Sequence, residues 1–145
     1  MALDLTQYQN EDRRPLDAAP AGEYEIALLK FKKDEDGGIV LFSERDGVER
    51  RYIMPMFEIV NHPDADSFKE FTHYLELPGD HLTGKEKRRK LAELEAFGQA
   101  FGFDLFAGEI NEEDLIGNTA AAVLIYQETE EFGNQNRIKQ FLVFK

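Results

Sequence analysis

The step Asp46-Gly47 constrains the fold of this chain more than any other feature of its sequence. It stands between the apolar residues Phe42 and Val48, and an Asp-Gly step in such a setting is the strongest short-range signal for a β-hairpin. Upstream, apolar and polar residues alternate from Gly22 onward with the period of a half-buried strand. We therefore expect a meander of three antiparallel strands, over residues 22–33, 39–43 and 48–54.

The segment after this meander is less regular. Pro55 lacks a backbone N–H, so we expect it to end the pairing of the third strand or to lie on an edge. Phe68, Phe71 and Leu75 stand at helical spacing, which predicts a short helix over residues 64–75. We interpret residues 55–83 as an insertion into the domain.

A longer helix is predicted to begin after Thr83 and to run to Phe101. Thr83 is an expected N-cap residue, and Glu86 three positions later completes the pattern of a capping box. Gly102 is placed to end the helix. The apolar face of this helix then consists of Leu91, Leu94, Phe97 and Phe101.

Two more strands, over residues 120–126 and 136–144, are predicted to form a second hairpin. The order of three strands, a helix and two strands is that of the OB-fold, a five-stranded Greek-key barrel. We expect a mainly β domain over residues 22–145, an OB-fold-like antiparallel barrel with one helix between strands 3 and 4. An irregular arm, residues 1–21, precedes it and is expected to pack through Leu3, Leu5 and Tyr8. Another α+β domain with a five-stranded sheet has the same order and is the alternative.

Composition limits the functional classes. Of 145 residues, 17 are Lys or Arg and 29 are Asp or Glu, and a formal net charge of −12 argues against a protein that coats duplex DNA nonspecifically. The absence of Cys excludes disulfides and Cys-ligated zinc and is typical of a cytosolic protein. No apolar run approaches the roughly 18 residues of a membrane span, so we expect no membrane contact.

Basic and aromatic residues stand close together in several places. Phe31 lies between two lysines and leaves the apolar alternation of the first strand, which predicts an exposed ring that stacks on bases. On the last strand, period two puts Arg137, Lys139 and Phe141 on one face. The residues that we expect to bind nucleic acid are Lys30, Phe31, Lys32, Lys33, Arg45, Arg50, Arg51, Tyr52, Lys87, Arg88, Arg137, Lys139 and Phe141.

Catalytic patterns are weak in this sequence. The three histidines, His62, His73 and His81, are not spaced like metal ligands, although Asp64 and Asp66 lie near the first of them. No phosphate-binding glycine loop and no nucleophile motif are present. We therefore expect a protein that is not an enzyme and that uses no metal or cofactor, with a metal-dependent nuclease as the weakest of three hypotheses.

Short motifs give the chain a resemblance to a known family. They are Gly22-Glu23-Tyr24 at the first strand, Phe97-Gly98-Gln99-Ala100-Phe101-Gly102 at the helix end, Asp114-Leu115-Ile116-Gly117, and Gly133-Asn134-Gln135-Asn136-Arg137-Ile138. With these motifs the chain resembles phage-encoded single-stranded DNA-binding proteins of the OB-fold type over about residues 20–145. The resemblance implies that a sheet face with its flanking loops holds single-stranded DNA without a metal or cofactor, through Phe31, Lys32, Arg50, Tyr52, Arg137, Lys139 and Phe141.

The leading hypothesis is sequence-independent binding of single-stranded DNA in phage replication or recombination, in the cytoplasm of the host. Partners would include replication or recombination proteins and other copies of the chain. The alternative is an acidic interaction module or DNA mimic that binds a host protein. It rests on residues 103–131, which hold eight acidic residues and no Lys or Arg.

Overall fold

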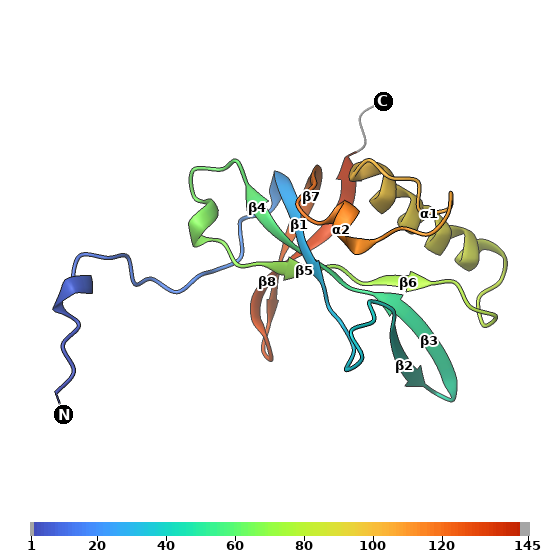
Figure 1. Ribbon diagram of the computed structural model, residues 1–145, viewed down its shortest axis with the longest axis horizontal. Helices are drawn as coiled ribbons and strands as arrows, with labels where there is room; N and C mark the ends of the chain where they lie inside the picture. Colours follow the sequence, from blue (N-terminus) through green and yellow to red (C-terminus); the bar gives the residue numbers. More distant parts are fainter. Residues whose placement is uncertain (1, 143–145) are drawn as a thin grey trace.

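In the computed structural model, which describes residues 2–142, the chain is mainly β, with antiparallel sheets and one long helix (Figure 1). One sheet has the order β5-β4-β1-β7-β8 and the other the order β2-β3-β6. The strands are β1 (Gly22–Phe31), β2 (Leu41–Arg45), β3 (Val48–Ile53), β4 (Pro55–Val60), β5 (Phe71–Thr72), β6 (Leu75–Leu77), β7 (Thr119–Thr129) and β8 (Gly133–Leu142). The helical elements are α1 (Gly84–Ala100), the short α2 (Glu112–Leu115) and the 3-10 turns η1 (Thr6–Tyr8) and η2 (Ala65–Ser67).

The two sheets are connected by chain segments that pass from one to the other. Only Met54 separates β3 from β4, and β3 pairs with β2 and β6 whereas β4 pairs with β1 and β5. Likewise, only His73 and Tyr74 separate β5 from β6. Each pair of segments is therefore one bent strand, and the bends fold the two sheets around a common core.

The predicted Asp46-Gly47 hairpin is confirmed. Asp46 has a φ of 54° and Gly47 a φ of 78°, which are the two positive values of a type I′ turn. Arg45 and Val48 face each other directly across this turn. The second hairpin, β7 with β8, is confirmed as well, although the end of the predicted strand at residue 144 lies outside the described residues.

The three-stranded meander is wrong in one respect. In the described chain β2 pairs with β3 as expected, but β1 pairs with β4 and β7 and not with β2. Nine residues, 32–40, separate β1 from β2, which is too long for a tight hairpin turn. The continuation of β3 into β4 instead brings residues 55–60 beside β1.

The predicted helix over residues 64–75 does not form. The 3-10 turn η2 is followed by the strand segments β5 and β6, which supply Phe71 and Leu75 to the core. The helical spacing is overridden because these residues pair in register with β3 and β4. Residues 55–83 thus contribute strands to both sheets.

The predicted long helix is confirmed as α1. Thr83 is its N-cap residue, but its side chain makes no capping hydrogen bond. Gly84 begins the helix with a φ of 57°, and this left-handed entry replaces the expected capping box. Leu94, Phe97 and Phe101 of the predicted apolar face are buried, whereas Leu91 is 36% exposed.

Aromatic rings fill the space between α1 and the strands. Phe57 of β4 stacks on Phe101 with ring centroids 5.6 Å apart and meets Phe97 edge-on at 6.3 Å. Gly98 brings the helix end against the following loop, because a Cβ at this position would lie 2.8 Å from the carbonyl oxygen of Phe103. A larger residue at this position would push the loop away from the core.

The outer edges of the five-stranded sheet approach each other without pairing. Within residues 2–142 no ladder joins β5 to β8, so the predicted barrel is not closed. Residues 17–19, here called the strap, lie in this gap. The backbone of Asp17 exchanges hydrogen bonds with Ser67 and Lys69 near β5, and Ala19 exchanges two hydrogen bonds of 2.8 Å with the side chain of Asn136 on β8.

The N-terminal arm contacts the body through the strap. Ala18 and Ala19 are buried, whereas Leu3, Leu5 and Tyr8 are exposed, Leu3 to 83%. The predicted packing through these three residues is therefore wrong. Figure 1 shows the arm before the strap directed away from the sheets.

Candidate nucleic-acid interface

Phe31 is buried rather than exposed. The register between β1 and β4 shifts between Leu28 and Lys30, which marks a β-bulge. The extra residue returns Phe31 to the inner face, where it is 3% exposed and its ring centroid lies 6.4 Å from that of Phe97. The predicted stacking platform is wrong because strict alternation fails at the bulge.

A second bulge has the same effect on Phe141. The register between β7 and β8 shifts between Val123 and Leu124, opposite Lys139. Phe141 therefore lies on the same inner face as Ile138, with its ring centroid 5.9 Å from that of Phe97. The prediction that Phe141 shares a face with Arg137 is also wrong, because period two does not hold across the bulge.

A groove of about 370 Å³ lies on the outer surface between the β7–β8 hairpin and the β4–β5 edge. Its cations come from three separate segments: Lys32 after β1, Lys69 before β5, and Arg137 on β8. One carboxylate, Glu70, lies among these lining residues. The groove therefore carries a positive charge in a strongly acidic chain, and we refer to it below as the basic groove.

The apolar part of the basic groove comes from β4 and from the hairpin tip. Met54 and Met56 point outward from the bent strand, because side chains alternate between its two faces and residues 53, 55 and 57 are buried on the other face. Phe132 at the tip is 64% exposed. Its backbone N–H donates to the Thr129 hydroxyl, which in turn donates to the carbonyl of Gly133, so the tip has a defined shape.

The cations of the basic groove are held by neighbouring strands. Lys69 donates to the backbone carbonyl of Asn134 at 2.8 Å and so links the β5 side to β8. Arg137 donates to the side chain of Gln127 on β7. Burial, and secondarily the charge of Arg137, lower the pKa of His73 to about 4, so that this imidazole is neutral at pH 7.

The outer face continues from the basic groove along the bent strand to Tyr52. The rings of Tyr52 and Tyr74 pack at 4.8 Å between centroids and 33° between planes, and Tyr74 is 40% exposed. Burial and then the charge of Glu76 raise the pKa of Tyr74, and Arg50 opposes this effect. The tyrosine pair therefore lies within electrostatic reach of both charged groups.

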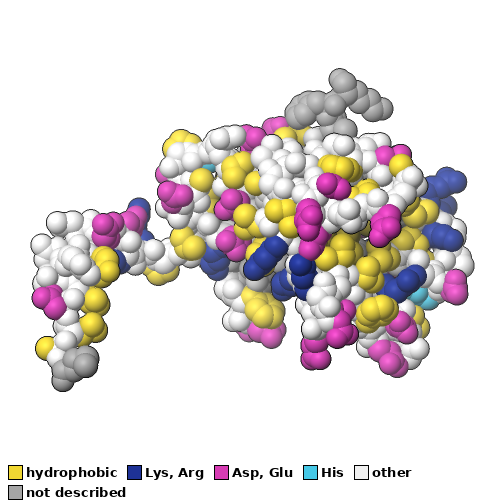
Figure 2. Space-filling view, in the orientation of Figure 1, with side chains coloured by type: hydrophobic (Ala, Val, Ile, Leu, Met, Phe, Trp, Pro, Cys, Tyr) yellow, Lys and Arg dark blue, Asp and Glu magenta, His cyan; other side chains and the backbone are white. Residues whose placement is uncertain are grey.

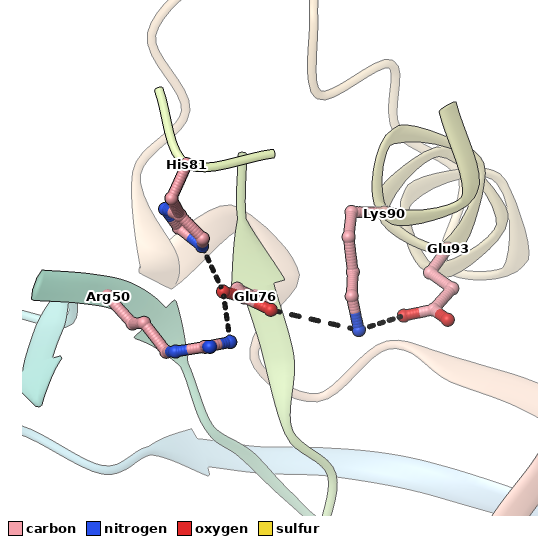
Figure 3. Close-up of polar contacts among 5 residues, drawn as sticks. All are labelled: Arg50, Glu76, His81, Lys90 and Glu93. Carbon is pink, nitrogen blue, oxygen red and sulfur yellow. Dashed lines mark hydrogen bonds and ion pairs between the residues drawn. The ribbon is translucent and has the colours of Figure 1, made fainter. Parts of the chain in front are cut away.

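Glu76 is a buried carboxylate, 3% exposed, at the far end of this face (Figure 3). Its Oε1 lies 3.4 Å from Nη1 of Arg50 and 2.9 Å from Nε2 of His81, and its Oε2 lies 3.8 Å from Nζ of Lys90 on α1. These contacts connect β3, β6, the turn after β6 and the helix. Arg50 is therefore a paired cation, whereas the cations of the basic groove form no ion pair with any carboxylate among residues 2–142.

The other predicted basic residues are dispersed. Lys30 faces Met56 near the basic groove, while Nζ of Lys33 lies 2.6 Å from a carboxylate oxygen of Glu112. Arg51 points to the opposite face of its sheet from Arg50. Figure 2 shows basic side chains in the middle of the body and, separately, at its edge. The predicted basic residues that are exposed and lie outside the groove lining are Lys30, Lys33, Arg45, Arg51, Lys87, Arg88 and Lys139.

Sequence reasoning missed several residues of this surface. Lys69 is an isolated base in a segment of mixed composition, and nothing near it signals contact with β8. An aromatic residue in a turn, such as Phe132, is a usable signal, because turns are solvent-exposed. The missed residues are Met54, Met56, Lys69, Tyr74, Glu76 and Phe132.

The acidic stretch does not form one patch. Its first residues lie before β7 and its last, Glu128, Glu130 and Glu131, lie at the β7–β8 tip. The strand between them spans about 35 Å. Glu112 is also paired with Lys33.

Within residues 2–142, no three His, Asp or Glu side chains converge as metal ligands would. None of the helices in this range is long and apolar enough to cross a membrane. The chain matches no model of a known protein family and no curated protein sequence.

Proposed function

We propose that this protein binds single-stranded DNA, with little dependence on sequence, along the outer face that contains the basic groove. The observation that carries the proposal is the convergence of Lys32, Lys69 and Arg137 around apolar side chains, of which that of Phe132 is exposed. Cations that follow a phosphate backbone, together with aromatic residues that stack on bases, are the usual means of holding a single strand.

The arrangement of the strands supports this function. The strands of the five-stranded sheet follow one another along the chain as β1, β4, β5, β7 and β8, while β2 belongs to the other sheet. Numbered in this way, the sheet has the order third, second, first, fourth, fifth, with α1 between the third and fourth strands. This is the order of an OB-fold that is open between its third and fifth strands. The connections that flank an OB-fold binding face correspond to the one from β1 to β4, which begins with residues 32–40, and to the β7–β8 tip, and Lys32 and Phe132 line the basic groove from these two connections.

The distribution of acidic residues favours this function over a DNA mimic. A mimic needs carboxylates spaced like phosphates on one face, whereas here they fall into two groups separated by the length of β7. Because the sequence motifs resemble those of phage proteins, we propose that this activity serves phage replication or recombination in the host cytoplasm. Acidic residues outside the groove would repel the additional phosphates of a duplex.

The test is fluorescence anisotropy of a labelled oligothymidine of about 30 nucleotides, titrated at two salt concentrations beside a duplex of equal length. We expect single-strand binding that weakens with salt and little binding of the duplex. Arg137→Gln should reduce the slope of log K against log salt by about 0.7, and Lys87→Gln, which removes the same charge on α1, should leave it unchanged. Absence of single-strand binding at low salt would contradict the proposal.

A further inference from the structure

The two ends of the outer face differ in charge. Three cations and one carboxylate line the basic groove. The hollow between β6 and α1, at the other end, is lined by three cations and three carboxylates. These residues are Arg50, Arg89, Lys90, Glu76, Glu86 and Glu93.

Arg50 is the cation of this hollow that lies nearest the tyrosine pair. It is two residues from Tyr52 on β3 and therefore on the same face of the sheet. Tyr52 itself faces Glu76 across the β3–β6 ladder, and Glu76 pairs with Arg50. The aromatic rings, the guanidinium and the carboxylate thus form one unit.

Glu76 is fixed in place by more than Arg50. His81 and Lys90 contact the same carboxylate, and Lys90 also lies 4.0 Å from Glu93, as Figure 3 shows. Removing a carboxylate from water is costly unless cations lie beside it, and Glu76 has three such neighbours. Arg50 lies 3.4 Å from this buried carboxylate, so part of its positive charge is already offset before a phosphate approaches.

We propose that the tyrosine pair and the Arg50–Glu76 pair form a base-binding subsite in which Glu76 cancels the charge of Arg50. Tyr52 and Tyr74 offer ring faces to a nucleobase, while the phosphates lie toward the basic groove. Glu76 is a positioning residue, since it acts through Arg50. This inference rests on the proposed function and deepens it by assigning bases to one end of the face and phosphates to the other.

The first test distinguishes the contribution of the bases to binding from that of the phosphates. Wild-type protein is titrated with oligothymidine and with an abasic oligomer of the same length, which carries the same phosphates. The double variant Tyr52→Leu with Tyr74→Leu should lose roughly tenfold in affinity for oligothymidine and little for the abasic oligomer, with an unchanged salt slope. Tyr8→Leu, on the exposed arm, is the matched control and should change neither.

The second test measures how much the charge of Arg50 contributes to the salt dependence of DNA binding. Arg50→Gln should leave the salt slope as in wild type, because a paired cation releases few counterions, whereas Arg137→Gln lowers it by about 0.7. Glu76→Gln should raise both the affinity for oligothymidine and the salt slope, since Arg50 is then free to bind a phosphate. If Glu76→Gln fails to fold, Arg50→Gln still decides, because Glu76 keeps His81 and Lys90.

The outcomes distinguish this inference from the proposed function. If wild-type protein binds neither oligomer, both fail. If it binds oligothymidine but the tyrosine variant retains full affinity, only the base-binding subsite is overturned. An equal loss of slope in Arg50→Gln and Arg137→Gln would overturn the role of Glu76.

Discussion

The inner and outer faces of the same strands carry aromatic residues in very different surroundings. On the inner face, Phe31, Phe57 and Phe141 pack edge-on or stacked against rings of α1 and its C-cap residue. On the outer face, Tyr74 and Phe132 remain largely exposed beside charged groups. An aromatic residue flanked by lysines can belong to either face, so neighbours in sequence do not decide whether a ring packs or binds.

The largest expected effect is a loss of stability from a substitution on the inner face. Phe31→Ala should lower the free energy of unfolding by about 3–5 kcal/mol, because it leaves a cavity against Phe97. Urea denaturation measures this loss, and Phe132→Ala at the exposed tip should change stability by less than about 0.5 kcal/mol. A Phe31→Ala protein of wild-type stability with weakened DNA binding would place Phe31 on the outer face after all.

The free energy of unfolding should depend on pH through His73. Its pKa of about 4 in the folded protein lies below 6.5, so the unfolded chain binds the proton more readily. The stability contributed by neutral His73 is therefore complete above pH 6.5 and is lost as the pH falls from 6.5 to 4, by about 3 kcal/mol in all.

Urea denaturation between pH 7 and 4 measures this dependence. His73→Asn should flatten the loss of stability in that window, and His62→Gln, which removes the histidine that packs against Tyr24 and Phe68, should not. The same pH dependence in His73→Asn and wild type would show that other groups cause it.

Asn136 is a polar residue on the inner face, and it holds the strap. Asn136→Ala should cost about 2 kcal/mol, because the backbone N–H and carbonyl of buried Ala19 lose their partners. Unfolding curves and proteolysis near the strap measure the effect. Asn134→Ala, which loses one exposed hydrogen bond to Asp17, is the control, and an equal loss in both variants would contradict the role of burial.

Local signals predicted the local structure well. The Asp46-Gly47 turn, the β7–β8 hairpin and α1 depend on residues that are neighbours in sequence, and each is confirmed. The bulges in β1 and β8 were not predictable in this way, because they are visible only as shifts of register against a partner strand. One unrecognised residue in each strand was enough to reverse the predicted orientation of Phe31 and Phe141.

The candidate site was predicted only in part for the same reason. Lys32 and Arg137 were identified as basic residues beside aromatic ones, and both line the basic groove. Lys69 and Glu76 depend on contacts across 65 and 26 residues of sequence, with Asn134 and Arg50 respectively. Such pairs follow from how the bent strands pass between the sheets, and no short motif encodes them.

The smallest expected effect is a loss of DNA affinity from a substitution on the outer face, at the hairpin tip. Phe132→Ala should weaken binding of oligothymidine by about 1 kcal/mol, roughly fivefold, because one ring face for stacking is lost while every cation of the basic groove remains. Anisotropy titrations should show an unchanged salt slope, since no charge is removed. Phe106→Ala, an exposed phenylalanine outside the groove lining, is the matched control and should bind like wild type. Equal weakening of binding by both variants, or a changed salt slope in Phe132→Ala, would mean that the tip contributes to shape or charge rather than to stacking. In that case the distinction between aromatic rings that pack in the core and rings that bind DNA would not hold at the tip.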